Sequence, residues 1–303
     1  MTKQDNPELT AFRQKIDAID DQIVALLADR SQVVKQVGAL KDKTTPGQCA
    51  IRPGREADML RRIMDKCSNN GFPPAAAAAI WRMLISASTS LEAPLKLSVF
   101  APDNDPVLYW LAREYFGPFT PVVAQPHVKR VIGDVMDGTA SVGIIPAIRS
   151  DDSSNWWTHL IQSGANTPKI FAHIPFVYHD APGKNVPSAL AIARIAPEAS
   201  SDDVSILMIE TDHNVSQHKL QQAFTSAKLD ARWINIAMLS TATRHHLVEI
   251  KGFVTTEHES MKSFTKALGS SIANIGFVGA YATPVTLQPK TATKETNVKS
   301  SKA

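Results

Sequence analysis

Residues 7–44 read PELTAFRQKIDAIDDQIVALLADRSQVVKQVGALKDKT, and this stretch decides the fold of the N-terminal region. Its apolar side chains recur mostly at intervals of three and four residues, and Gly38 is the one Gly or Pro after Pro7. Such spacing predicts an amphipathic helix. Asn6, Pro7 and Glu8 are typical of a helix start. The apolar positions are Phe12, Ile16, Ile19, Ile23, Leu26, Leu27, Val33, Val34, Val37 and Leu40.

The length of this helix predicts a partner. At about 1.5 Å per residue, roughly 35 residues make a rod of about 50 Å, which cannot bury its apolar stripe within a domain of about 90 residues. The simplest partner is a second copy of the chain. A second helix is expected from Pro53, and a third from the Pro73–Pro74 pair to Glu92. Residues 7–94 are therefore predicted to be all-helical.

The sequence pattern changes after residue 94. Up to residue 200, short β-rich runs alternate with helical stretches, which predicts a parallel α/β region. From residue 201 to 287 the order is strand, helix, strand, strand, helix, strand, as in ferredoxin-like folds. Residues 288–303 contain one bulky apolar residue, Val298, and are expected to be disordered. The expected helical stretches of the α/β region are Val107–Phe116, Val128–Met136 and Trp157–Ser163.

Composition excludes several classes of protein. The 303 residues carry 32 basic and 29 acidic side chains, an excess too small to argue for nucleic-acid binding. Cys49 and Cys67 are too few for a disulfide framework or a four-cysteine zinc site, and their scarcity fits a reducing compartment. No apolar run is typical of a signal peptide or a membrane span, so a cytoplasmic protein is expected. Phosphate-loop, dinucleotide, nucleophile-elbow and metal-binding motifs are missing, and neither cofactor nor metal is expected.

The polar residues of the helices suggest a possible site. Arg30 and Lys41 are 11 residues apart, about 20° from one line at 100° per residue, so they share a face. Arg13 lies 17 residues before Arg30, about 100° around the helix, so it points to another face and could serve a different site. Ser88 and Glu92 share a face of the third helix. Spacing alone favours solvated side chains, because most charged residues on helices are exposed.

A family resemblance changes that interpretation. With these polar residues at these spacings, residues 7–93 resemble the all-helical chorismate mutase. The resemblance implies a domain-swapped homodimer of intertwined chains with two buried sites, each taking Arg13 from the other subunit. The residues that carry it are Leu9 to Arg13, Asp20, Leu26 to Arg30, Val37 to Lys41, Arg55, Glu56, Trp81, Ile85, Ser88 and Glu92.

The resemblance also implies a reaction, the rearrangement of chorismate to prephenate. This step is unimolecular and requires no nucleophile, metal or cofactor. Arg13 and Arg30 would clamp the two carboxylates, because a guanidinium binds a carboxylate through paired hydrogen bonds. Lys41 and Glu92 would stabilise the negative charge that grows on the ether oxygen, and Glu56 would accept a hydrogen bond from the substrate hydroxyl. The catalytic candidates are Arg30, Lys41 and Glu92, and the binding candidates add Arg13, Arg52, Arg55, Glu56 and Ser88.

Two positions depart from the family pattern. Arg52 stands where many members carry an acid, and the loop before it is about two residues longer than in the most compact members. Its role as a substrate-binding residue is therefore open. Glu92 stands where many bacterial members carry glutamine and some fungal members carry glutamate.

The C-terminal half resembles, more weakly, the dehydratase and ACT parts of the bifunctional mutase–prephenate dehydratase. The run DGTASVGIIPA at 137–147 and the run VGAYATP at 278–284 carry this resemblance. The dehydratase motifs are absent, because Arg149 stands in the turn after Pro146 and Ala189–Ile195 holds no Thr-Arg-Phe. Residues 95–200 are therefore interpreted as a degenerate dehydratase-like region, and 201–287 as an ACT-like domain.

Three functions stay open. The first is a homodimeric chorismate mutase of phenylalanine and tyrosine biosynthesis. The second is a bifunctional mutase–dehydratase. The third is a non-catalytic regulator whose C-terminal half binds a small molecule or a partner enzyme.

Overall fold

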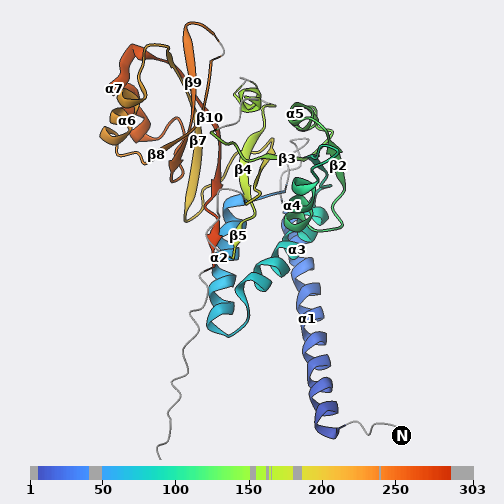
Figure 1. Cartoon of the computed structure of the whole chain (residues 1–303). Coiled ribbons are helices and arrows are strands. Elements are labelled where there is room, and N and C mark those ends of the chain that lie inside the picture. Colours follow the sequence, from blue (N-terminus) through green and yellow to red (C-terminus); the bar gives the residue numbers. More distant parts are fainter. Residues whose placement is uncertain are drawn as a thin grey trace, which may run out of the picture.

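A computed structural model describes residues 6–40, 50–150, 155–161, 164, 166–179, 186–238 and 240–287. The N-terminal region is helical, as predicted (Figure 1). The predicted end of the first helix near Thr44 and the predicted disordered tail lie outside the described residues. The helices are α1 (Pro7–Leu40), α2 (Pro53–Asn69) and α3 (Pro74–Glu92).

Helix α1 projects away from the rest of the chain (Figure 1). Across its described residues 7–40 it has no buried residue, although its C-terminal half contacts α3. Its exposed apolar side chains alternate at spacings of three and four, the repeat that packs one helix along another. The fold of a single chain therefore leaves this face uncovered. The side chains of this repeat are Leu9, Phe12, Ile16, Ile19, Ile23, Leu26, Val33, Val37 and Leu40, and Val24 beside it is also exposed.

The rest of the chain is built on one nine-stranded sheet, in the order β2-β1-β3-β6-β4-β10-β7-β9-β8. Two short strands, β5 and β11, pair with each other in parallel and form a separate two-stranded sheet. The strands are β1 (Leu97–Phe100), β2 (Val122–Gln125), β3 (Val142–Pro146), β4 (Lys169–Ile174), β5 (Val177–Tyr178), β6 (Ala189–Ala193), β7 (Asp203–Asp212), β8 (Ala231–Ala237), β9 (Thr243–Lys251), β10 (Ile272–Ala282) and β11 (Val285–Thr286).

The α/β part is only partly parallel. Strand β1 pairs parallel with β2 and β3, and α4 (Val107–Phe116) and α5 (Val128–Met136) form where the sequence predicts them. Strand β6 is antiparallel to both β3 and β4, which corrects the all-parallel expectation. The physical reason is that no crossover helix among the described residues joins β4 to β6, and parallel neighbours need such a connection.

The third predicted helix of this part is a short 3-10 helix, Trp156–Leu160, rather than a helix over Trp157–Ser163. Trp156, Trp157 and Leu160 are all buried in the core beneath the sheet. Two adjacent tryptophans fill the space with one tight turn, and residues 162 and 163 of the predicted stretch lie outside the described residues.

The predicted βαββαβ order is confirmed in the last part of the chain. Strands β7, β8, β9 and β10 are interleaved with α6 (Gln217–Ser226) and α7 (Glu259–Leu268). Neighbouring strands in the order β10-β7-β9-β8 are all antiparallel. The two helices cover one face of these strands, where Phe224 and Phe264 stack with ring centroids 4.3 Å apart (Figure 1).

The sheet continues across the predicted boundary at residue 200. Strand β10 lies beside β4, with Gly279 opposite Ile170. A Cβ atom at Gly279 would lie 2.2 Å from the carbonyl oxygen of Ile170, so only glycine permits this approach. The domain boundaries at residues 94, 200 and 287 stay predictions. No helix within the described residues is long and apolar enough to cross a membrane.

Candidate active site

The contact between α1 and α3 brings three predicted site residues together. Arg30 Nη1 donates to Ser88 Oγ at 2.5 Å, and Ser88 Oγ donates in turn to the Leu84 carbonyl at 2.6 Å. One turn further along α3, Glu92 lies directly against α1, because a methyl group added at Gly38 would be 3.3 Å from Glu92 Cγ. Arg30, Ser88 and Glu92 therefore line one seam. Lys41 falls just beyond the end of α1 as described and lies outside the described residues.

Arg13 cannot join this seam within one chain. It is exposed on α1, 17 residues before Arg30. On a continuous helix this separation is about 26 Å. A site that uses both arginines must take them from two chains.

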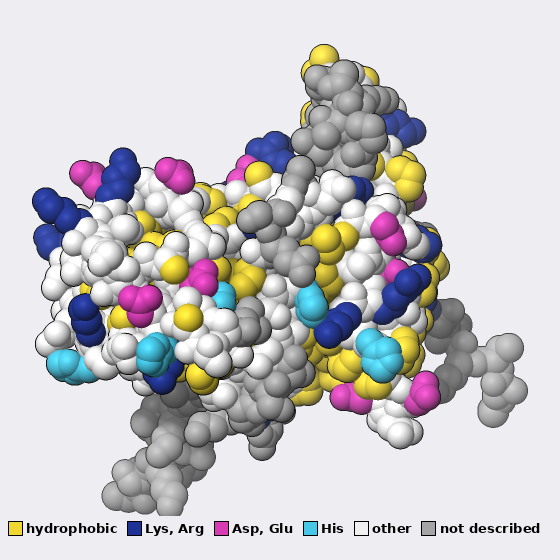
Figure 2. Space-filling model, turned by 90° about the horizontal axis from the view of Figure 1, so that it is seen from above, with side chains coloured by type: hydrophobic (Ala, Val, Ile, Leu, Met, Phe, Trp, Pro, Cys, Tyr) yellow, Lys and Arg dark blue, Asp and Glu magenta, His cyan; other side chains and the backbone are white. Residues whose placement is uncertain are grey.

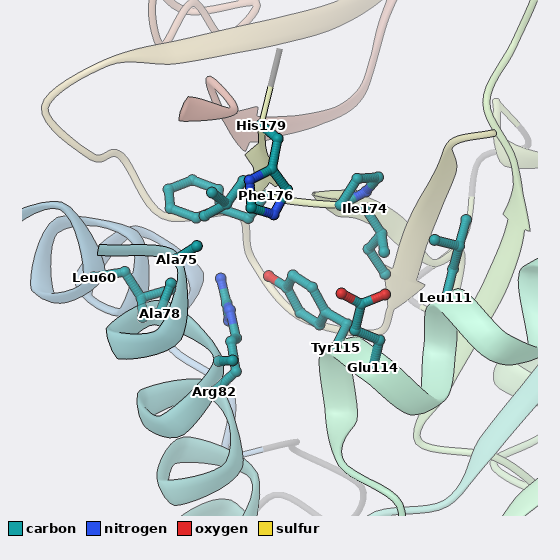
Figure 3. Close-up of a pocket in the computed structure, with 13 residues that line it drawn as sticks. Leu60, Ala75, Ala78, Arg82, Leu111, Glu114, Tyr115, Ile174, Phe176 and His179 are labelled. Carbon is teal, nitrogen blue, oxygen red and sulfur yellow. The ribbon is translucent and has the colours of Figure 1, made fainter. Parts of the chain in front are cut away.

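The start of α2 places Glu56 against α3. Glu56 Oε1 accepts from the Arg52 backbone N–H at 3.1 Å, and Oε2 accepts from Arg82 Nη1 at 3.2 Å. The side chains of Arg82 and Glu56 are 9% and 13% exposed, so the pair is shielded from water. The Arg82 guanidinium carbon lies 3.9 Å from the centre of the Tyr115 ring (Figure 3).

The remaining two α2 candidates face the C-terminal region or solvent. The Arg52 side chain forms an ion pair with Glu198, with Nε 3.1 Å from Oε1. The hydrogen bond from Arg52 is the main cause that lowers the pKa of Glu198 below its ordinary value. The Arg55 side chain is exposed. Gly54 lies so close to the Ala199 carbonyl that no larger residue fits, since a Cβ would be 2.2 Å away.

The predicted residues thus form two groups on α3. Arg82 lies six residues before Ser88, about 120° around the helix, so these two side chains leave α3 in different directions. The sequence reasoning missed Arg82, Tyr115 and Glu198. A signal for Arg82 existed, because it occupies the same helical face as Ala78 and Ser86, which are buried.

One cavity lies beside the Arg82 group, and another lies apart from both groups in the sheet region. One of about 140 Å³ lies beside Arg82, between α2, α3, α4 and the turn before β5 (Figure 3). The other, of about 440 Å³, lies where the α/β strands meet β8, β9 and β10. In its wall the Tyr281 hydroxyl donates to Glu249 Oε1 at 2.8 Å, and Arg232 pairs with the same carboxylate. Burial lowers the pKa of His173 and raises that of Tyr281 well above 10.

The face in Figure 2 has charged side chains of both signs, interspersed rather than gathered into a basic patch. This distribution accords with the small net charge of +3. The absence of a nucleic-acid partner stays a prediction.

Residues 12–93 match the family model of chorismate mutase type II. The match confirms the family resemblance of the helical region and contains Arg13, Arg30, Arg82, Ser88 and Glu92. A chorismate mutase from Methanocaldococcus jannaschii is 29% identical over 85 residues, which are 28% of this chain and 84% of that protein.

Longer relatives extend the similarity beyond the mutase region. A bifunctional chorismate mutase/prephenate dehydratase from Pseudomonas aeruginosa is 26% identical over 153 residues, 50% of this chain and 41% of that protein. The chain therefore spans well under half the length of this relative. The structure of prephenate dehydratase from Streptococcus mutans covers 63% of this chain and 99% of that chain, with 14% identity and a TM-score of 0.47.

Proposed function

We propose that this protein is a chorismate mutase that acts as a homodimer in the cytoplasm, on the route to phenylalanine and tyrosine. The observation that carries the proposal is the seam between α1 and α3. Arg30, Ser88 and Glu92 converge there, within the residues that match the mutase family. No other motif in the sequence offers a competing chemistry for this region.

The donors at the seam suit a reaction that needs positioning and charge stabilisation. Arg30 binds one carboxylate of chorismate, with Ser88 holding its guanidinium in place. Such a clamp selects the folded conformer in which the two reacting carbons are near each other. Lys41 and protonated Glu92 donate to the ether oxygen as its C–O bond breaks, and Glu56 accepts from the ring hydroxyl.

The exposed apolar face of α1 supports the proposed dimer. Its ten large exposed apolar residues need a cover, and a second α1 offers a face of the same repeat. Because Arg13 is about 26 Å from Arg30 along one helix, a dimer is also the arrangement that completes the site. Each site would take Arg13 from one chain and Arg30, Lys41, Ser88 and Glu92 from the other.

A chorismate-depletion assay on the purified chain tests the proposal. We expect chorismate loss with matching formation of prephenate, and a loss of about a hundredfold or more in kcat/KM for Arg30→Met. Arg62→Met is the matched control, because Arg62 is an exposed arginine on α2. Absence of chorismate turnover by a folded, dimeric chain would refute the proposed function.

The cavity beside β8, β9 and β10 favours a second role for the C-terminal half. Its volume of about 440 Å³ and its mixture of apolar walls with His173, Arg232 and Glu249 are typical of small-molecule sites. We therefore infer that the ACT-like region binds an effector or, through its surface, a partner enzyme. Release of phenylpyruvate from prephenate would instead support the bifunctional alternative.

A further inference from the structure

Arg82 on α3 is a buried cation that the reaction does not obviously need. It is 8% exposed, and its Nε has no hydrogen-bond partner among the described residues. A buried ion pair is costly to desolvate, and an apolar pair of the same size is often as stable or more stable. Stability of the fold therefore does not account for the Arg82–Glu56 pair.

The C-terminal region fixes Arg82 in place. Tyr115 of α4 presents its ring face 3.9 Å from the guanidinium carbon, and the Phe176 ring lies 5.4 Å away. Burial raises the pKa of Tyr115 to about 12, so this ring stays neutral at physiological pH. Figure 3 shows the Tyr115 hydroxyl and the end of the Arg82 side chain turned toward one another beside the cavity. Neither aromatic residue lies within residues 12–93.

Arg82 in turn fixes Glu56. One oxygen of the Glu56 carboxylate accepts from Arg82 and the other from the Arg52 backbone, so its orientation is set at both ends. Each oxygen has a second lone pair with which to accept from a substrate hydroxyl. The chain of contacts runs from Tyr115 through Arg82 to Glu56.

We propose that Arg82 is a positioning residue of the mutase site, and that Tyr115 makes this positioning depend on the C-terminal region. This inference rests on the proposed function. It gives the C-terminal region a part in mutase catalysis that requires no second active site. A ligand or partner that shifts α4 would change the mutase reaction through the same contacts.

The test is a double-mutant cycle in the full-length dimer, with kcat and KM measured at 25 °C for wild type, Arg82→Met, Glu56→Gln and the double variant. We expect each single variant to lose about ten- to a hundredfold in kcat/KM, as for a hydrogen bond to a charged group. The double variant should be no worse than the poorer single one, and Arg82→Lys should recover part of the loss. The matched control Arg62→Met should retain the wild-type value.

A second pair of variants tests the C-terminal contact even if Arg82→Met fails to fold. Tyr115→Leu should lower kcat/KM by about five- to thirtyfold, while Tyr115→Phe, which keeps the ring, should retain most of it. Melting temperature and dimer mass are recorded for every variant, and a purely structural role would change these while leaving kcat/KM at 25 °C unaltered. Additive losses in the cycle, or wild-type kinetics in Tyr115→Leu, would overturn the inference. A wild-type chain that does not consume chorismate would instead overturn the proposed function.

Discussion

Helix α1 and the sheet region differ in how much of their apolar surface is buried within one chain. Helix α1 buries nothing within the chain and exposes an apolar face along its length. The sheet region encloses its apolar residues in clusters on both faces, with Trp157, Phe171, Phe224 and Phe264 fully buried. The described sheet region covers its apolar residues within one chain, whereas α1 leaves an apolar face exposed. The proposed dimer would cover that face, and the proposed active site lies beside it.

The largest expected effect comes from the two arginines of α1. Arg13→Ala and Arg30→Ala should each lower kcat/KM by about a thousandfold, because in the proposed site each arginine pairs with a substrate carboxylate. Mixed dimers of the two variants should regain about one intact site per dimer, because the proposed site takes Arg13 and Arg30 from different chains. The measurement is activity after unfolding and refolding the two variants together. Heterodimers that form without regaining activity would contradict the shared site.

A charge on the exposed face of α1 should weaken the proposed dimer and leave the fold of the sheet region unchanged. Ile16→Asp places a carboxylate in the apolar repeat and should raise the dimer dissociation constant by about a hundredfold, with loss of activity at low protein concentration. Light scattering over a concentration series measures this. The sheet region should keep its near-ultraviolet circular dichroism. Lys15→Glu, on the neighbouring exposed position, is the control and should leave the dimer intact.

A substitution in the core of the sheet region should lower its unfolding free energy and leave the proposed dimer intact. Phe224→Ala removes a fully buried ring that stacks on Phe264 and should cost about 3–5 kcal/mol of unfolding free energy. Chemical denaturation followed by tryptophan fluorescence reports it. Dimer mass at low temperature should be unchanged, because α1 lies away from this core. Dissociation of the dimer together with the loss of stability would show that the two regions are not independent.

Two variants test the donor role of Glu92. A group that stabilises the negative charge developing on the ether oxygen must donate a hydrogen bond to it. Glu92→Gln supplies an amide donor and should retain most of kcat/KM, whereas Glu92→Ala removes the donor and should lower kcat/KM by about a hundredfold. Wild-type kinetics in Glu92→Ala would remove Glu92 from the donor role.

The smallest expected effect is a stability change at acid pH. Burial, with repulsion from Arg244 and His245, lowers the pKa of His246 to about 4. The unfolded chain takes up a proton near pH 6.5 that the folded chain does not bind until about pH 4, so stability falls across this window as the pH drops. Between pH 7 and pH 4.5, the melting temperature of His246→Gln should fall by about 3 °C less than that of wild type. The exposed control His218→Gln should follow wild type.

Local signals in the sequence were sufficient for much of the fold. Prolines and apolar spacing placed the starts of α2 and α3, and the strands and α-helices from β7 to β10 formed in the predicted order. Strand direction was not accessible in this way, because a fully buried run such as Ala189–Ala193 looks the same parallel or antiparallel. The pairing of β4 with β10 joins residues more than a hundred positions apart, which no local pattern encodes.

In the candidate site, too, helical spacing predicted some contacts, and others depend on packing between distant segments. Arg30, Ser88 and Glu92 lie on faces that helical spacing fixes, and the structure brings them together. The sequence could not reveal that Glu56 would pair with Arg82, or Arg52 with Glu198, because those contacts depend on how α2 and α3 pack against the C-terminal region. Which of the predicted residues touch chorismate stays a prediction.

The position of β10 has a consequence for synthesis. It is the last long strand among the described residues, yet it lies between β4 and β7 in the middle of the sheet. Until residues 272–282 leave the ribosome, β4 and β7 each present an open edge of unpaired backbone groups. Such edges readily pair with other chains, and pairing over a long sequence separation is slow. The nascent chain is therefore most exposed to aggregation just before β10 emerges, and any truncation upstream of residue 272 makes that exposure permanent.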